Sequence, residues 1–440
     1  MKKVLAIGYY DDFARFFLAI KKELKLKDEH IEFKYMSVFL SGTLYFLFRF
    51  QQVIFLPFQA RIKSLIWAKK YKTLAKKNNY KGVNLSKLII FNKYLSPNKE
   101  IEFRVLSVIY IDIIEKYLKR EKPDLVILSG DTRIMVGVFV ELTKIKNIPV
   151  YYFEQGPFGT TIFDEKGVNA NASLRGVKYF GTEYSISEKK AKVDDFLTKK
   201  RRQTYYRIPF YRLIDYLIQF ILHPIGLLPL DLYLPVTVNK ISTGDLLQEV
   251  DLGPKEKLFL LVLQVPYDAN MTNHSPFFSN HSDILKNVYE ALPKNAKLVV
   301  REHPLFKGRY EKEVYDFMME NEISLDLKPL YQSIDTCDVV IVNNSTVGVE
   351  AISRMKQLIV LGNAYYDDSD VCLKLKHKTE LESLLEKSLV IKVNEDKNID
   401  FLYFFLFEFL LDGHFRDEDL IIANGLVERL FNDKYSFGDM

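Results

Sequence analysis

Carboxylate, imidazole and hydroxyl side chains follow several apolar stretches of the sequence at the points where those stretches end. In the carboxyl-terminal half these are Asp268, His303 and the tripeptide Asn344-Ser345-Thr346. In the amino-terminal half they are Glu154 and Asp131. Polar groups at the carboxyl ends of parallel strands lie where α/β proteins bind their ligands. We therefore expect these residues to contact a substrate.

The side chains at these positions suit the transfer of a sugar from a phosphate ester. The charge on a leaving phosphate can be stabilised by a helix amino terminus together with His303 or Arg301. An oxocarbenium-like centre needs a carboxylate, and the acceptor hydroxyl needs a base. Asp268 and Glu154 are the candidates for these two roles. Simpler structural roles stay open: Asp268 as a helix cap, His303 as a turn residue, and Glu154 as an ion-pair partner of a Lys or Arg.

The stretch 339–352 combines the elements that such a site requires. Four β-branched aliphatic residues at 339–342 predict a buried parallel strand, and an amphipathic helix pattern follows a short polar turn. Ser345 or Thr346 fits the helix N-cap. The exposed N–H groups of such a helix suit a phosphate, and Glu350 could accept hydrogen bonds from ribose hydroxyls. An ordinary strand-to-helix turn is the alternative.

We expect no metal ion and no other cofactor. No Asp-X-Asp pair occurs in the strand context that holds a metal–diphosphate, and the acidic run 367–370 is interpreted as a solvated loop. The two cysteines, Cys337 and Cys372, form neither a disulfide framework nor a metal-ligand cluster. This cysteine usage favours a cytoplasmic location.

Alternating strand and helix patterns must position these residues. In the first half, strands are predicted at 1–8, 31–36, 125–128 and 150–153. Helices are predicted at 11–27, 101–118 and 132–146. The segment 37–80 is expected to be helical, and the small, polar segment 160–173 to be a loop. This rhythm indicates a parallel sheet with helices on both faces.

The second half repeats the same rhythm. Strands are predicted at 258–263, 297–301, 323–326, 339–342 and 357–362. Helices are predicted at 281–292, 309–320 and 330–337, with a loop at 272–276. Helical segments from 401 onward are expected to pack back on the first domain. The predicted fold is α/β and GT-B-like, with two doubly wound Rossmann-like domains facing each other across a cleft. The predicted domains are 1–250, which faces the acceptor and the membrane, 251–395, which binds the nucleotide sugar, and the returning helices 396–440.

Length and composition agree with this organisation. A chain of 440 residues, 48% of them apolar, predicts two or three domains at roughly 150 residues each. The apolar run at 4–8 is too short for a signal peptide. No run of about 20 uncharged apolar residues occurs, so we predict no transmembrane helix.

The net charge of +5 is distributed unevenly. Residues 33–99 contain thirteen Lys and Arg residues, no Asp or Glu, and many aromatic side chains. The helical segment 37–100, which overlaps this stretch, fits an anionic membrane face. Nucleic acid and a solvated basic helix without a partner are the alternatives, and no recognisable nucleic-acid-binding module is present. The segment 185–245 reads as an insertion, basic and aromatic at first and then apolar. It could lie at a membrane interface or form a buried helical hairpin.

Four groups of residues, taken in order, resemble the capsule polysaccharide synthesis family, which includes the KpsS/KpsC-type bacterial β-Kdo transferases. They are Phe153-Glu154-Gln155-Gly156 with Gly167-Val168-Asn169; Leu263-Gln264 through Asp268 to His274-Ser275-Pro276-Phe277; Glu302-His303-Pro304-Leu305 with Gly308; and Asn344-Ser345-Thr346-Val347-Gly348-Val349-Glu350-Ala351 through Leu361-Gly362-Asn363-Ala364-Tyr365-Tyr366-Asp367. Each group is short, but their shared order makes the resemblance fairly specific.

The resemblance implies a donor, CMP-β-Kdo, and a product formed with retention of configuration. Asp268 is similar to the family's candidate nucleophile and Glu154 to its acid/base carboxylate. His303 and Ser345-Thr346 are similar to its CMP and phosphate contacts. The expected substrate-binding residues are Gln264, His274, Ser275, Arg301, Asn344, Ser345, Thr346, Glu350, Asn169 and Asp131.

The implied partners are a CMP-sugar donor, a lipid-linked saccharide acceptor, the anionic inner face of the cytoplasmic membrane and other capsule-assembly proteins, with no nucleic acid. A transferase of the same fold that uses another CMP-ulosonic acid or a UDP-sugar is one alternative. A non-catalytic membrane scaffold of glycan assembly is another.

Overall fold

The chain folds into two compact units. The structure is a computed structural model that describes residues 2–177, 184–199, 206–222, 240–246, 252–266, 268–367 and 370–432. The first unit comprises Met1–Val168, Lys200–Pro235 and Phe407–Met440. The second comprises Asn169–Lys199 and Val236–Leu406. The units therefore do not divide at the predicted domain boundaries, 250/251 and 395/396. The chain first leaves the first unit after Val168, because residues 169–199 pack with the second unit.

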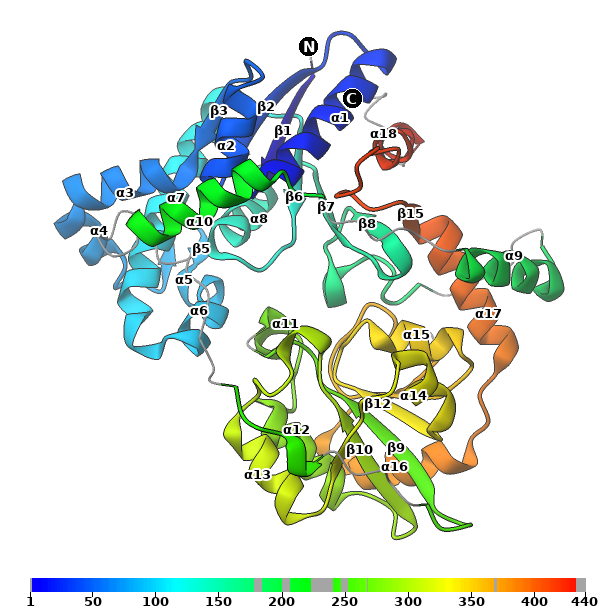
Figure 1. The fold of residues 1–440 in the computed structure, drawn as a ribbon. Coiled ribbons are helices and arrows are strands. Elements are labelled where there is room, and N and C mark those ends of the chain that lie inside the picture. The colour runs from blue at the N-terminus through cyan, green and yellow to red at the C-terminus, as the bar shows by residue number, and fades with distance from the viewer. Residues whose placement is uncertain are drawn as a thin grey trace. The chain divides into compact units, whose positions relative to one another are not determined.

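The first unit is built on a seven-stranded sheet with the order β15-β8-β7-β6-β1-β2-β3 (Figure 1). The strands are β1 (Lys3–Gly8), β2 (Glu32–Ser37), β3 (Val53–Phe55), β6 (Leu125–Ser129), β7 (Val150–Gln155), β8 (Thr160–Asp164) and β15 (Leu410–Asp412). The pairings from β7 through β6, β1 and β2 to β3 are parallel. β8 and β15 are antiparallel additions at one edge. β1 is buried along almost its whole length, as its apolar sequence predicts.

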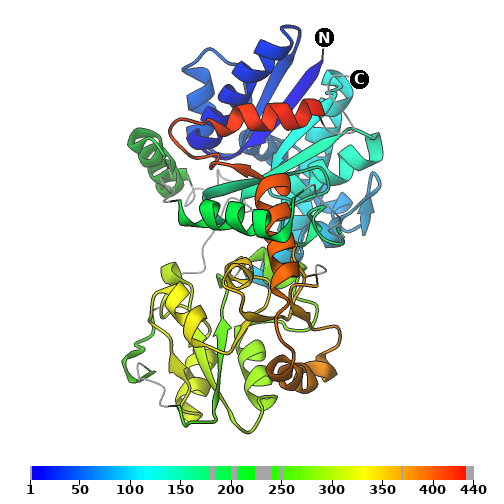
Figure 2. The same cartoon turned by 90° about the vertical axis from the view of Figure 1, so that its right-hand side faces the viewer.

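Helices accompany this sheet. They are α1 (Asp11–Lys27), α2 (Leu40–Leu47), α3 (Leu56–Ile66), α4 (Ala68–Leu74), α5 (Leu85–Leu88), α6 (Ile90–Leu95), α7 (Glu100–Glu121), α8 (Ile134–Lys146), α10 (Pro209–Leu222) and α18 (Ile422–Asn432). A small hairpin, β4 (Asn79–Tyr80) and β5 (Val83–Asn84), lies between α4 and α5. α18 packs against α1, so the end of the chain rejoins its beginning (Figure 2).

Three segments of the first unit differ from the sequence predictions. The predicted loop 160–173 begins with β8, a strand whose residues are all buried between β7 and β15. Its β-branched and aromatic residues favour a strand, and the turn before it uses left-handed backbone at Phe158 (φ 58°) and Gly159 (φ 72°). The segment predicted to be helical at 37–80 contains β3, and the helical segment predicted from 401 contains β15. Strands this short carry no periodic signal, and only the sheet edges that they complete define them.

The second unit has a wholly parallel six-stranded sheet. Its strands are β9 (Lys257–Val262), β10 (Ala296–Arg301), β11 (Ser324–Leu325), β12 (Val339–Val342), β13 (Gln357–Val360) and β14 (Leu373–Lys374). They are arranged as β11-β10-β9-β12-β13-β14. Numbered within the unit, this is the order 3-2-1-4-5-6 of a Rossmann sheet. Two α/β units, each built on a sheet with a parallel core, confirm the predicted α/β, GT-B-like fold class.

The helices of the second unit lie around its sheet, except α9, which packs on α17 (Figure 1). They are α9 (Ile186–Thr198), α11 (Ala269–Asn273), α12 (His281–Glu290), α13 (Lys312–Glu320), α14 (Leu330–Thr336), α15 (Val347–Ser353), α16 (Leu381–Val390) and α17 (Glu395–Tyr403). α11 occupies part of the predicted loop 272–276. α17 packs on α9, where Lys189 pairs with Asp400 at 2.5 Å. α17 thus belongs to the second unit, and the chain returns to the first unit only from Phe407 onward.

Among the described residues, no helix is both long enough and apolar enough to cross a membrane.

The core of the first unit depends on one aromatic cluster, which yields a stability prediction. Phe153 is fully buried, and its ring centroid lies 5.1–5.8 Å from those of Phe13, Phe16, Phe17 and Phe415. Because Phe153→Ala removes a ring that contacts four others, we expect it to lower the unfolding free energy by about 3–5 kcal/mol in a urea titration.

The matched control is Phe210→Ala, since the Phe210 side chain is 56% exposed on α10. We expect this change to stay within roughly 0.5 kcal/mol of the parent chain. Equal effects of the two substitutions would contradict the cluster's central role.

Candidate functional site

A cavity of about 150 Å³ lies at the carboxyl ends of the second sheet's strands. Its lining comes from the segments that follow β9, β10, β12 and β13. Two further lining residues, Asn169 and Ala170, lie in the segment after β8. The lining residues are Asn169, Ala170, Gln264, Val265, Asp268, Asn270, His303, Asn344, Ser345, Thr346, Asn363, Ala364 and Tyr365. Ligand sites commonly span about 300–1,000 Å³, so this cavity would hold only part of a nucleotide sugar.

The strand order explains the position of the cavity. β9 is first in the unit's chain order and β12 is fourth, and the two strands are direct neighbours. The crossover after β9 leads to β10 on one side, and the crossover after β12 leads to β13 on the other. The two connections diverge and leave a crevice at this topological switch point. Asp268 follows β9 and Asn344 follows β12, so both of them border this crevice.

Hydrogen bonds from amide side chains connect the segments that form the crevice. Asn343 is buried, and its Nδ2 donates to Gln264 Oε1 at 3.3 Å. Asn344 Nδ2 donates to the backbone carbonyls of Asn270 and His274. Gly362 approaches so closely that a Cβ there would lie 2.5 Å from Asn343 Oδ1, which explains the glycine. These contacts join the segments after β9, β12 and β13.

Two buried polar groups in the cavity lining have no hydrogen-bond partner within the described part of the chain. They are Gln264 Nε2 and the Tyr365 hydroxyl. The side chains are only 6% and 4% exposed. A buried polar group without a partner costs about 1–3 kcal/mol. A ligand that supplies an acceptor to each group would remove this cost.

Asp268 both caps a helix and lines the cavity. It is the N-cap of α11, where Oδ1 accepts the Asn270 N–H at 3.2 Å and Oδ2 accepts from Asn270 Nδ2 at 3.1 Å. The same carboxylate lines the cavity. These bonds hold the carboxylate in one orientation, as a nucleophile or an electrostatic partner would require.

His303 faces the same cavity with a defined tautomer. Its Nδ1 accepts the Leu305 N–H at 3.3 Å, which leaves the proton of the neutral ring on Nε2. Burial lowers the pKa of His303, while the charge of Asp268 opposes this change. His303 is therefore a neutral hydrogen-bond donor near neutral pH.

The predicted helix start after β12 is present but differs in its cap. α15 has only seven residues, and Thr346 occupies the N-cap position with helical backbone angles and no side-chain cap. Ser345 Oγ instead accepts the Val347 N–H at 3.3 Å. Ser345 and Thr346 both line the cavity.

Three other predicted binding residues make structural hydrogen bonds beside the cavity. His274 is buried, and its carbonyl accepts the Asn363 N–H at 2.7 Å. Ser275 Oγ donates to the Phe278 carbonyl at 2.8 Å. Arg301 Nη1 binds Asp326 at 2.5 Å and the Lys328 carbonyl at 2.7 Å. None of these three residues lines the cavity.

Glu350 lies one turn into α15. Burial raises its pKa to about 7, although the positive charge of Arg301 acts in the opposite direction. Its charge in turn raises the pKa values of Tyr331 and Tyr365, each of which is raised mainly by burial. Glu350 is therefore electrostatically connected to the cavity through Tyr365.

Glu154 and Asp131 belong to the first unit, where they end β7 and follow β6. Glu154 Oε1 accepts the Gln155 N–H at 3.0 Å. Asp131 Oδ2 accepts the Val168 N–H at 3.5 Å. A Cβ at Gly130 would lie 3.5 Å from Glu154 Oε2, so the ends of these two strands are adjacent. The two carboxylates thus lie at the carboxyl ends of neighbouring parallel strands of the first sheet, as the sequence predicts.

In the acidic run at 367–370, which the sequence predicts to be a solvated loop, Asp370 is exposed but Asp367 is not. Asp367 is 4% exposed and pairs with Arg175 at 2.8 Å and with Lys374 at 3.0 Å. Arg175 Nη2 also donates to Asn363 at 3.2 Å. This ion pair fastens the segment that carries Asn169 to the segment after β13, and both segments line the cavity. Asp368 and Ser369 lie outside the described residues.

Sequence reasoning missed three polar lining residues, Asn270, Asn363 and Tyr365. Asn363 and Tyr365 follow β13, so the strand-end rule that singled out Asp268 could have found them. Asn270 is the second residue of α11, a helix too short to have a periodic signal. Within the described residues, no group of three or more His, Cys, Asp or Glu side chains could hold a metal.

Comparison with known proteins identifies the family to which this site belongs. The family model "Capsule polysaccharide biosynthesis protein" matches residues 124–377, more than half of the chain. The chain belongs to the capsule polysaccharide biosynthesis protein family. The matched range contains every cavity-lining residue as well as Glu154 and Asp131, so the family resemblance drawn from the sequence motifs is confirmed.

Two relatives of this chain show how much of their sequences it matches. Protein FixF of Sinorhizobium fredii is 30% identical over 203 residues, 44% of this chain and 48% of that protein. The capsule polysaccharide export protein KpsS of Escherichia coli is 30% identical over 142 residues, 30% of this chain and 35% of that protein. The chain therefore spans less than half the length of these two relatives.

Among solved structures, KpsC of Thermosulfurimonas dismutans, described as a β-Kdo 2,7 transferase, is similar with 16% identity and a TM-score of 0.34. The match covers 66% of this chain and 80% of the KpsC chain.

The buried carboxyl of Glu350 predicts a specific pH dependence of stability. Its pKa rises from 4.5 to about 7 in the folded chain. The protonated form is thus favoured by folding, and the stability that it contributes is lost as pH rises from the lower value to the higher one. At about 1.4 kcal/mol per tenfold change in acidity, the expected loss is on the order of 3 kcal/mol.

Glu350→Gln keeps the shape of the protonated acid and removes the titration. Urea titrations of both proteins at about pH 5 and about pH 8 should show the extra loss only in the parent chain. Parallel pH dependence in the two proteins would show that Glu350 does not titrate in this range.

Proposed function

We propose that this chain is a retaining glycosyltransferase that moves Kdo from CMP-β-Kdo to a lipid-linked or glycan acceptor in bacterial capsule or cell-surface polysaccharide biosynthesis. The observation that carries the proposal is the pair of buried groups without partners, Gln264 Nε2 and the Tyr365 hydroxyl, in a cavity at the switch point of a Rossmann sheet. Family membership supports the glycan context, and the motif resemblance supports the choice of Kdo.

The proposed reaction uses two displacements. In the first, Asp268 forms a bond to the anomeric carbon of Kdo as the bond from that carbon to the CMP phosphate oxygen breaks. CMP leaves with the bonding electrons, and the Nε2–H of His303 donates a hydrogen bond to its phosphate. Because His303 is neutral, this interaction needs no proton transfer. Ser345 and Thr346 supply further hydrogen-bond donors to the phosphate.

In the second displacement, the acceptor hydroxyl attacks the same carbon and releases Asp268 as a carboxylate. The hydroxyl proton passes to Glu154, which acts as the base in this step. Two inversions at one carbon give net retention. We propose that the reaction needs no metal ion, and that EDTA leaves the transfer rate unchanged.

The proposal includes partners and a location. The donor is a CMP-sugar and the acceptor a lipid-linked saccharide, so the enzyme would work on the cytoplasmic face of the inner membrane as a peripheral protein. Other capsule-assembly proteins are proposed as neighbours, and nucleic acid is not a partner.

Two measurements test the donor and the enzyme class. In thermal melting with CMP, UDP and GDP, we expect an increase in Tm with CMP alone. In a transfer assay, CMP-Kdo is generated in situ and offered with a synthetic lipid-like acceptor that carries one Kdo. A β-linked product would support donor, reaction and stereochemistry together. A shift with UDP alone would indicate a UDP-sugar, and no shift and no product would favour a non-catalytic scaffold.

The Asp268 carboxylate provides the sharpest test of the mechanism. Asp268→Asn keeps a good N-cap for α11, because Asn caps helices as well as Asp does. It removes the nucleophile, so we expect transfer to fall by at least about 10³-fold while Tm and the CMP-induced shift are retained. Full activity in this variant would exclude Asp268 as the nucleophile.

A further inference from the structure

The first unit exposes an apolar helix face that nothing within the described chain covers. On α10 the outward side chains are Phe210, Leu213, Tyr216, Leu217, Phe220 and Ile221, between 46% and 73% exposed. Their spacing of three and four residues places most of them along one side of the helix. Contiguous exposed apolar surface of this kind marks an interaction site.

The opposite side of α10 is fixed to the body of the first unit. Tyr211 is buried, and its ring centroid lies 5.4 Å from that of Tyr45 on α2. Asp215, the only acid on α10, accepts the Ser41 N–H and pairs with Arg207 at 2.6 Å. The helix is therefore held with its apolar side outward, and the outward side carries no acidic residue.

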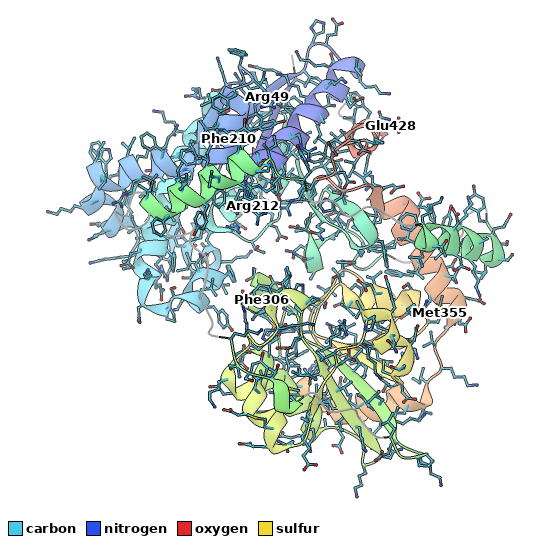
Figure 3. All side chains as sticks on the ribbon, viewed as in Figure 1. Arg49, Phe210, Arg212, Phe306, Met355 and Glu428 are labelled. Atoms are coloured by element: carbon cyan, nitrogen blue, oxygen red, sulfur yellow. The ribbon has the colours of Figure 1, made fainter. Side chains whose placement is uncertain are left out.

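A second exposed apolar side belongs to the acid-free segment that leads from α2 through α3 to α4. At the end of α2, Phe48 lies 6.4 Å from Tyr211 by ring centroid, which joins this segment to α10. The exposed apolar residues of the segment are Leu47, Phe48, Phe50, Phe58, Ile62, Leu65, Ile66 and Trp67. Figure 3 labels Arg49, Phe210 and Arg212 on this part of the first unit.

Basic side chains border these apolar residues. Lys69 and Lys70 on α4 are exposed, and Lys70 Nζ lies 5.9 Å from the centroid of the Trp67 ring. Together with Ile66 and Leu74 they line a shallow depression of about 520 Å³ on the surface. The sequence between Glu32 and Glu100 contains no Asp or Glu. Aromatic and aliphatic side chains flanked by Lys and Arg are the pattern of a helix that lies in the headgroup region of an anionic bilayer.

We propose that α10 and the α2–α4 segment form a docking surface for an anionic phospholipid bilayer. The inference rests on the proposed function in one respect, because a lipid-linked acceptor would be reached from such a surface. A second copy of this chain is a poorer occupant, since a two-fold contact brings a surface against its own counterpart and would set these unneutralised Lys and Arg side chains against each other. A bilayer with acidic headgroups supplies both the apolar interior and the opposite charge.

The single tryptophan of the chain makes the test direct. Trp67 is 53% exposed, and no other tryptophan contributes to the emission. The full chain is mixed with vesicles of phosphatidylcholine alone and of phosphatidylcholine and phosphatidylglycerol in equal parts. We expect a blue shift of Trp67 emission and co-sedimentation with the anionic vesicles only, both weakened by salt. Quenching by brominated lipid tails would place the ring at the headgroup–tail boundary.

Two sets of variants separate apolar from electrostatic binding. Leu213→Ser with Leu217→Ser and Phe220→Ser removes the apolar side of α10, and we expect the loss of both the blue shift and the co-sedimentation. Lys69→Glu with Lys70→Glu should lower partitioning by roughly tenfold or more. The matched control carries Leu26→Ser, Val390→Ser and Ile421→Ser, which are 75–82% exposed in the parent chain and lie outside this surface. The control should bind as the parent does.

No donor or acceptor is needed for this experiment, so its outcome is independent of catalysis. Absence of binding to anionic vesicles, or equal binding by the control and the α10 variant, would overturn the proposal. Self-association in analytical ultracentrifugation that the α10 variant abolishes, without vesicle binding, would assign the surface to a second copy. Emission that is already blue-shifted without vesicles would show that another part of the chain covers Trp67, and would likewise overturn the proposal.

Discussion

The parallel pairing of β9 with β12 is the constraint on which the candidate site depends. These two strands are neighbours in the sheet although two other strands separate them in the chain. Each can leave its carboxyl end in only one direction, because the crossovers on the two sides are right-handed. The resulting crevice cannot be filled by either connection. Asp268, His303 and the 344–346 turn are brought together there by topology, before any side-chain contact is considered.

Side-chain contacts then narrow this crevice to a cavity. The Asn343 amide holds the Gln264 side chain, and the ion pair between Arg175 and Asp367 brings in the segment that carries Asn169. Such a buried ion pair costs desolvation and is kept only where its geometry is good. Here a second cation, Lys374, and a backbone N–H complete the environment of the Asp367 carboxylate. The Asp367 carboxylate is thus fully paired, whereas Gln264 Nε2 and the Tyr365 hydroxyl have no hydrogen-bond partner within the described residues.

The first unit combines a closed apolar core with an exposed apolar surface. Its core is closed by an aromatic cluster around Phe153 and by the return of the chain through β15 and α18. Its surface, by contrast, leaves the aromatic and aliphatic residues of α10 and α3 in water. Arg207 illustrates how this is maintained, since it binds both Asp11 and Asp215 and thereby anchors α10 from its inner side.

The amino-acid sequence by itself determined the parts of this protein that periodicity and strand-end chemistry encode. Long helices such as α1 and α7 were predictable because each buries a regular face, and β12 was predictable because its four residues form a continuous apolar run. Asp268, His303 and Ser345 were predictable because polar residues that end apolar runs collect at the carboxyl ends of the parallel strands. The strands β3, β8 and β15 were not, since they complete the sheet only through hydrogen bonds to a neighbouring strand. Tertiary structure alone decided that Asp367 is buried, because its partner Arg175 is 192 residues away in the sequence. It also decided that α10 turns its apolar side outward, because the inner side is selected by Tyr45 and Ser41 on another helix and not by hydrophobicity.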